Sequence, residues 1–128
     1  MSELTNKIDV LENLYAHDSP NIEISNLASM LKISQKQLAD ALDLDASTVS
    51  RKEIGTNNKA LRKWMIVFNL LIDLIKKTEP ELARDKIQLK MNRWLKHPNS
   101  HFGNEAPLDL MLKGKARRVI NLLEQLSS

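Results

Sequence analysis

Side chains that can contact a nucleic acid are concentrated between Ser47 and Lys52. This stretch holds three hydroxyl side chains and two cations. An arginine such as Arg51 can donate two hydrogen bonds to guanine, and serine or threonine hydroxyls can reach bases or phosphates. A lysine and a glutamine one helix earlier are spaced to approach a phosphate. The predicted DNA-contacting residues are Lys36, Gln37, Ser47, Thr48, Ser50, Arg51 and Lys52.

Residues suited to catalysis or metal binding are sparse. His97 and His101 are four positions apart, but Pro98 separates them and no carboxylate is spaced to complete a metal site. The chain has no cysteine, and its three glycines are too few to build a phosphate-binding loop. We therefore expect no catalytic residue, no metal and no cofactor, and we predict that the protein is not an enzyme.

The composition favours an all-α protein. The 128 residues are 42% hydrophobic and 27% charged, which is the balance of one compact domain or two very small ones. Few glycines and 4% aromatic residues argue against an all-β fold. The start of the chain lacks a basic leader followed by an apolar run, and Asn69, Asp73 and Lys76 interrupt the longest apolar clusters. We expect a cytoplasmic protein with no membrane span.

Charge is distributed unevenly along the chain. Residues 1–31 carry one basic and five acidic side chains, whereas residues 32–63 carry seven basic and four acidic ones. A basic excess in the second stretch suits a polyanionic partner if the cations share a face. The net charge of +3 does not by itself decide the point.

Apolar periodicity predicts five helices in the first part of the chain. The first contains Leu4, Ile8, Leu11 and Tyr15; the second spans 24–31; and the third follows an N-cap at Ser34. A fourth helix is expected to start at Ser47, to point Val49 inward and to stop at Gly55, and a long fifth helix contains the stripe from Leu61 to Ile75.

Three further helices are expected in the last part. Thr78 and Glu81 form a capping-box pair that predicts a helix start, and Pro98 ends that helix. After a loop, Pro107 takes a first-turn position, and a final amphipathic helix runs from Ala116 to Leu126. The likeliest internal boundary lies between Lys76 and Pro80.

The third and fourth helices have the spacing of a helix-turn-helix, and their residues resemble the Xre/Cro-repressor family. That family usually has a glycine in the turn and an apolar anchor after the arginine, where this chain has Asp43 and Lys52. The matching or replaced positions are Gln35, Ala39, Asp43, Val49, Ser50, Arg51, Lys52, Glu53 and Gly55. The alternative interpretation is two packed amphipathic helices with polar outer faces.

The last third of the chain resembles the C-terminal domain of Xre/MbcA/ParS-type antitoxins. The matching residues are Trp94, Leu95, Pro98, Asn99, Gly103, Pro107, Leu108, Asp109, Leu110, Gly114, Val119, Leu122 and Leu123. The helical hairpin carries more apolar residues than a small core can hide, although each one singly could be interior. The predicted toxin-contacting residues are Asn99, Leu110, Met111, Lys113, Leu122 and Leu126.

These resemblances imply an all-α fold with a Cro/repressor-like helix-turn-helix bundle and a small C-terminal helical domain. The expected divisions are an accessory helix at 1–22, a DNA-binding domain at 23–77 and a toxin-binding and dimerisation domain at 78–128. By resemblance, the protein is an antitoxin that binds a RES-like, NAD-consuming toxin and, as a homodimer on operator DNA, represses its own operon. A protein-interaction module with a degenerate helix-turn-helix and a standalone regulator without a toxin remain the alternatives.

Overall fold

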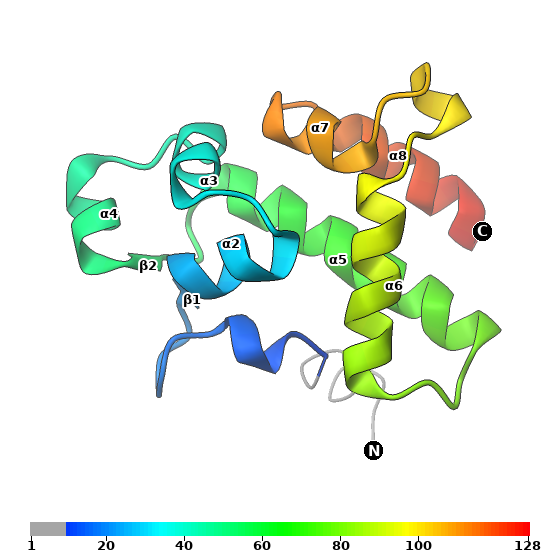
Figure 1. Cartoon of the computed structure of the whole chain (residues 1–128), viewed down its shortest axis with the longest axis horizontal. Coiled ribbons are helices and arrows are strands. Elements are labelled where there is room, and N and C mark those ends of the chain that lie inside the picture. The colour runs from blue at the N-terminus through cyan, green and yellow to red at the C-terminus, as the bar shows by residue number, and fades with distance from the viewer. Residues whose placement is uncertain (1–9) are drawn as a thin grey trace.

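The protein is all-α, as predicted. The structure, a computed structural model, describes residues 10–128, so Leu4 and Ile8 of the first predicted helix lie outside the described residues. Two short 3-10 helices and one two-stranded sheet accompany the α-helices (Figure 1). The elements are η1 (Glu12–Leu14), β1 (Ile22–Glu23), α2 (Ile24–Leu31), α3 (Gln35–Ala41), α4 (Ala46–Arg51), β2 (Glu53–Ile54), α5 (Lys59–Thr78), α6 (Arg84–Lys96), η2 (Ser100–Phe102), α7 (Pro107–Leu112) and α8 (Ala116–Ser127).

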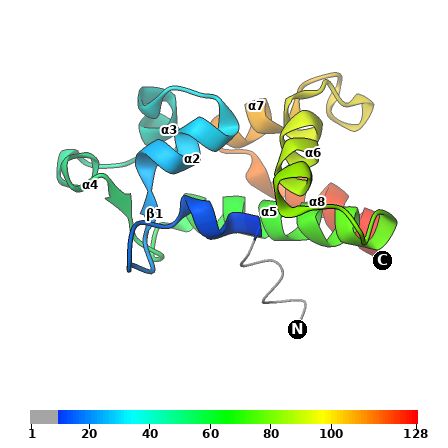
Figure 2. The ribbon, with the colours of Figure 1, turned by 60° about the horizontal axis from the view of Figure 1, so that its bottom comes forward.

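Helix α5 is the longest helix described and runs through the middle of the molecule. Asn58 caps it by accepting a hydrogen bond from the Leu61 N–H at 2.8 Å, and the Asn58 amide donates to the Leu42 carbonyl at 3.1 Å. The cap therefore also fastens the start of α5 to the end of α3. Helices α2, α3, α6 and α7 lie on one side of α5 in Figure 2, and α8 packs along α5 and contacts α7. Figure 1 shows α6 crossing in front of α5.

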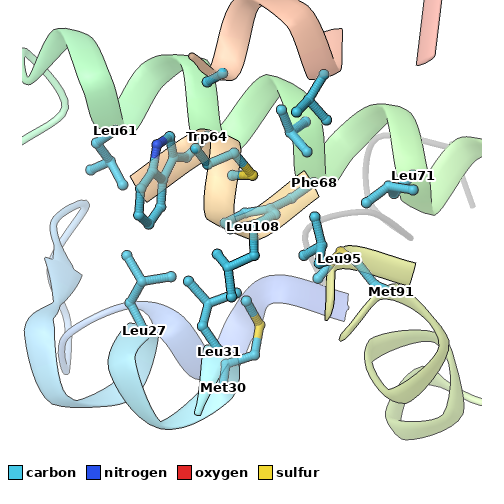
Figure 3. Packing of buried hydrophobic residues seen from close by; sticks show 14 of the residues in the cluster. Leu27, Met30, Leu31, Leu61, Trp64, Phe68, Leu71, Met91, Leu95 and Leu108 are labelled. Atoms are coloured by element: carbon cyan, nitrogen blue, oxygen red, sulfur yellow. The ribbon is translucent and has the colours of Figure 1, made fainter. Parts of the chain in front are cut away.

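One hydrophobic cluster joins the two halves of the chain. Trp64 and Phe68 of α5 are fully buried, and they meet Leu27 of α2, Met91 of α6 and Leu108 of α7 in the same cluster (Figure 3). Replacing a buried aromatic of this kind by alanine typically costs about 3–5 kcal/mol. The predicted division near residue 77 is thus crossed by a continuous core, although the chain does turn there.

The capping-box prediction at Thr78 and Glu81 is wrong. Helix α5 continues through Thr78, whose Oγ1 donates to the carbonyls of Leu74 and Ile75 at 3.2 and 3.1 Å. The hydroxyl therefore satisfies carbonyls at the end of one helix instead of N–H groups at the start of the next. Helix α6 begins only at Arg84 and has no side-chain cap.

The end of the predicted first helix is also wrong. Tyr15 has extended backbone angles and pairs in a bridge with Ile22, so the helical part described here ends with η1 at Leu14. Strands β1 and β2, which the sequence analysis missed, pair antiparallel with Ile22 opposite Ile54. Two-residue strands leave no readable alternation in a sequence.

Candidate nucleic-acid and partner interfaces

Helix α4 carries most of the predicted DNA-contacting side chains, and Asp45 starts it. The Asp45 carboxylate accepts from the Thr48 N–H at 2.7 Å and from the Ser47 hydroxyl at 2.9 Å. These bonds, led by the one from the Thr48 backbone, lower the pKa of Asp45 below its ordinary value. The predicted N-cap at Ser47 is therefore wrong, because the aspartate two residues earlier has the stronger acceptor.

Helix α4 projects from one end of the molecule and buries none of its residues (Figure 1). Val49 is 44% exposed, so the prediction that it packs inward is wrong. Leu44, just before the helix, is the half-buried residue that packs against the core at this end. A helix with no interior side chain of its own depends on its flanking segments for position.

Those flanking segments hold α4 at its C-terminal end. The helix stops at Lys52, which has the left-handed φ of 65°, and not at Gly55 as predicted. The Lys52 carbonyl accepts from the Ile24 N–H at 2.9 Å, and β2 follows at once with Ile54 fully buried. Ile54 therefore takes over the anchoring that the sequence analysis assigned to Val49.

The turn before α4 has a residue in the left-handed conformation at the position where the resembling family has a glycine. Asp43 has a φ of 53°, in the region that favours glycine, and aspartate is one of the side chains that tolerates it. The Leu44 N–H donates to the Ala39 carbonyl at 3.0 Å and closes the end of α3. Together α3, this turn and α4 place two short helices in sequence with a tight connection.

The predicted DNA-contacting side chains are accessible, but they differ in exposure and in the partners that they already have. Ser47, Ser50, Arg51 and Lys52 are exposed, whereas Thr48 is half-buried and accepts a hydrogen bond from Arg51 at 3.3 Å. On α3 the remaining two have partners within the helix: Lys36 forms an ion pair with Asp40 at 3.8 Å, and Gln37 completes a capping box with Ser34. Lys36 and Gln37 are thus held by partners within α3, whereas the exposed cations at α4 have fewer partners.

The loop between α6 and α7 is held in shape by its own polar groups. Asn99 caps η2 by accepting from the His101 N–H at 2.9 Å, and it forms a backbone bridge with Glu105. Gly103 and Asn104 follow with left-handed φ angles of 63° and 68°. The predicted turn at Gly103 is confirmed. The Asn99 side chain, predicted to contact a toxin, is used within the loop as the cap of η2.

Two contacts join this loop to the hairpin of α7 and α8. Lys113 forms an ion pair with Glu105, and the Arg118 guanidinium lies 5.8 Å from the centre of the Phe102 ring. The hydrogen bond from Lys113 lowers the pKa of the Glu105 carboxyl, and the same contact raises the pKa of Lys113. Lys113 thus lies at the surface but already has a partner.

The predicted toxin-contacting leucines and methionine divide between core and surface. Leu110 and Met111 are fully buried, Leu122 is 7% exposed, and all three belong to the hydrophobic cluster. Leu126 is 54% exposed at the end of α8. Of the four predicted apolar contacts, Leu126 alone has a largely exposed side chain. The other three are part of the core on which the hairpin packs.

Comparison with known proteins finds a match for the C-terminal region. Residues 88–128 match the family model of the antitoxin Xre/MbcA/ParS C-terminal toxin-binding domain. This region is similar to the toxin-binding domains of that family. The match confirms the resemblance drawn from the loop and hairpin residues. No curated protein and no solved structure matched the chain.

No group of three or more histidine, aspartate or glutamate side chains within residues 10–128 is placed to hold a metal ion. No helix described here is long and apolar enough to cross a membrane.

Sequence reasoning missed the exposure of Val49. This valine places a large apolar side chain between Thr48 and Ser50 on the surface of α4. The signal available in the sequence was Ile54, an apolar residue after the helix that could replace Val49 as anchor.

Proposed function

We propose that this protein neutralises a toxin by direct binding through residues 88–128 and represses its own operon by binding DNA through α3 and α4. The family match over residues 88–128 is the observation that carries the antitoxin role. By resemblance, the toxin belongs to the RES-like, NAD-consuming class. The antitoxin itself acts by binding and supplies no catalytic group.

The DNA-binding part of the proposal is supported by the placement of α4. A helix that enters the major groove must be accessible along its length, and α4 projects from the molecule with Arg51 and Lys52 exposed (Figure 1). Arg51 would donate to guanine once it leaves Thr48, and Ser47 and Ser50 would contact bases or phosphates. The exposed Val49 adds an apolar group that suits the methyl group of thymine.

A symmetric homodimer is part of the same proposal. Asp40, Asp43 and Asp45 precede α4 in the chain, and their negative charge opposes the approach of α4 to phosphates. Two copies of α4 on two half-sites would add their contacts and overcome this repulsion.

A salt titration of operator binding tests the DNA arm. If a dimer neutralises about six to ten phosphates, affinity falls roughly a thousandfold or more between about 50 and 200 mM salt. Arg51→Ala is expected to weaken operator binding by about 1–3 kcal/mol. Lys63→Ala on α5 is the matched control, because it removes an exposed cation outside the predicted contact set. Equal losses in both variants would show that only bulk charge matters.

The toxin arm is tested by co-expression with the protein encoded next to this one. We expect the pair to co-purify and the toxin's effect on growth to be suppressed. Leu126 at the end of α8, Lys113 before its start and the partly exposed Asn99 are the predicted contacts that lie outside the core, whereas Leu110, Met111 and Leu122 are buried. Arg51→Ala should leave neutralisation unchanged.

The three aspartates near α4 favour a second candidate, a protein-interaction module whose helix-turn-helix no longer reads DNA. Under that alternative the wild-type protein would show no operator binding at low salt, yet it would still bind its toxin. A standalone regulator would show the reverse, with operator binding and no toxic neighbour.

A further inference from the structure

A groove lies between the end of α2 and the C-terminal half of α6, away from α4. It is lined by cations from both helices and by apolar side chains of α6, among them Lys32, Leu89, Asn92, Arg93, Trp94 and Lys96. No carboxylate lines it. Figure 1 shows α2 and α6 adjacent at this point, whereas α4 occupies the opposite end of the molecule.

Two cations of α6 outside the groove have ion-pair partners, whereas the three groove cations have none among the described residues. Arg84 forms an ion pair with Glu12, and Lys90 forms one with Glu79. Within residues 10–128, no ion pair is found for Lys32, Arg93 or Lys96. Partial burial and, after it, the positive charge of Lys32 lower the pKa of Lys96. An anionic group entering the groove would relieve the repulsion between these two lysines.

The rest of the lining combines the apolar side chains of Leu89 and Trp94 with the polar Asn92 and His97. Leu89 is 39% exposed, and Trp94 is half-buried beside it. The Asn92 amide donates to the Met30 carbonyl and so fastens α6 to α2 at this groove. The groove thus combines a mainly apolar surface with three cations, which is a composition found at protein-binding surfaces.

We propose that this groove binds an acidic, partly apolar segment of a partner protein. Carboxylates of the segment pair with Lys32, Arg93 and Lys96, and an apolar side chain packs on Leu89 and Trp94. Most of this lining lies within residues 88–128, so the inference rests on the partner binding proposed for that region and adds a contact surface to it, apart from α4 and from the exposed end of α8. Loss of peptide binding with toxin co-purification intact would overturn this inference alone.

A nucleic acid fits the groove less well than a peptide does. Phosphate backbones bind where polar and charged donors predominate, and this groove exposes mainly apolar surface. Single strands also need stacked, accessible aromatic faces, whereas Trp94 is the groove's one tryptophan and is half-buried. An apolar side chain flanked by carboxylates satisfies both parts of the lining.

Tryptophan fluorescence of the full chain tests the proposal. Trp64 is 1% exposed and stays buried, so a change in emission on titration reports on Trp94. The probe is a short synthetic peptide that alternates pairs of glutamates with leucines. We expect saturable binding that weakens with salt. A peptide with serines in place of the leucines, and one with lysines in place of the glutamates, should each bind at least about tenfold more weakly.

Matched charge variants locate the site. Arg93→Glu and the milder Lys32→Gln should weaken the glutamate-leucine peptide, the first by at least about tenfold, while Lys63→Glu on α5 should not. Circular dichroism confirms that each variant is folded, and Lys32→Gln keeps the test valid if Arg93→Glu is not. Unchanged affinity in the groove variants, no saturable response in the wild type, or tighter binding of an oligothymidylate than of the peptide would overturn the proposal.

Discussion

Two leucines of α8, one turn apart, should respond differently to the same substitution. Leu122 is 7% exposed and packs in the core, whereas Leu126 is 54% exposed near the end of the helix. Leu122→Lys places a charge among apolar side chains, and Leu126→Lys places one where water can solvate it. The pair therefore separates loss of folding from loss of partner binding.

The magnitudes follow from burial. Leucine to alanine at a buried site costs about 2–5 kcal/mol, and Leu122→Lys adds the desolvation of an unpaired ammonium, so its loss should reach at least about 3 kcal/mol. At roughly 3–5 °C per kcal/mol for a chain of this size, Tm should fall by about 10 °C or more. Leu126→Lys loses part of an apolar contact, but a cation in the last turn favours the helix dipole, so its net change should stay within about 0.5–1 kcal/mol.

Thermal and urea denaturation of both variants measure the stability difference, and a pull-down with the toxin measures binding. We expect Leu126→Lys to retain its Tm within a few degrees and to weaken toxin binding by at least about tenfold. The reasoning is refuted if Leu126→Lys lowers Tm as much as Leu122→Lys does, or if it is folded and binds toxin as the wild type does.

Two further predictions concern the turn and the ion pair. Asp43→Gly removes a side chain from a residue with a φ of 53°, so it should raise the free energy of unfolding by up to about 1 kcal/mol in urea denaturation; a decrease would mean that the Asp43 side chain has a stabilising role that the backbone angle hides. The pKa of Glu105 is lowered by Lys113, so their contact stabilises the fold above the ordinary glutamate pKa and is lost as pH falls through the lowered value. Because the pKa of Lys113 is raised by the same contact, the stabilisation persists through neutral pH and is lost as pH rises through that raised value. In Lys113→Met the Glu105 pKa, followed by NMR titration, should return toward its ordinary value, and an unchanged pKa would contradict this assignment.

Much of the core could be predicted from helical periodicity. The stripe from Leu61 to Ile75 marks α5, and Ile87, Met91 and Leu95 of α6 face the core as their spacing required. Such positions are readable because a long amphipathic helix repeats its apolar residues over several turns. The C-terminal loop was likewise marked by Asn99, Gly103 and Pro107.

Local competition between side chains explains why the helix caps could not be predicted from the sequence. Asp45 and Ser47 are both acceptable N-caps, and only the backbone conformation decides that Asp45 accepts the Thr48 N–H. Thr78 similarly bonds backward to α5 instead of forward to Glu81. The six residues of α4 are too few to show a periodicity, so the exposure of Val49 depends on the strand pairing that follows.

The interfaces were less predictable than the core. The sequence pattern of a leucine at helical spacing is the same whether the side chain packs in the core or contacts a partner. Tertiary packing buries Leu110, Met111 and Leu122. The groove beside Trp94 joins residues from α2 and α6 that lie far apart in the sequence, so no local pattern signals it.

Co-expression with the adjacent gene product tests the central claim most directly. The measurement is growth of cells that carry the neighbour alone, with this protein, or with its Leu126→Lys variant. We predict arrest with the neighbour alone, rescue by the wild type together with a co-purifying complex, and loss of rescue with the folded variant. A neighbour that does not impair growth, or rescue without any physical complex, would contradict the account.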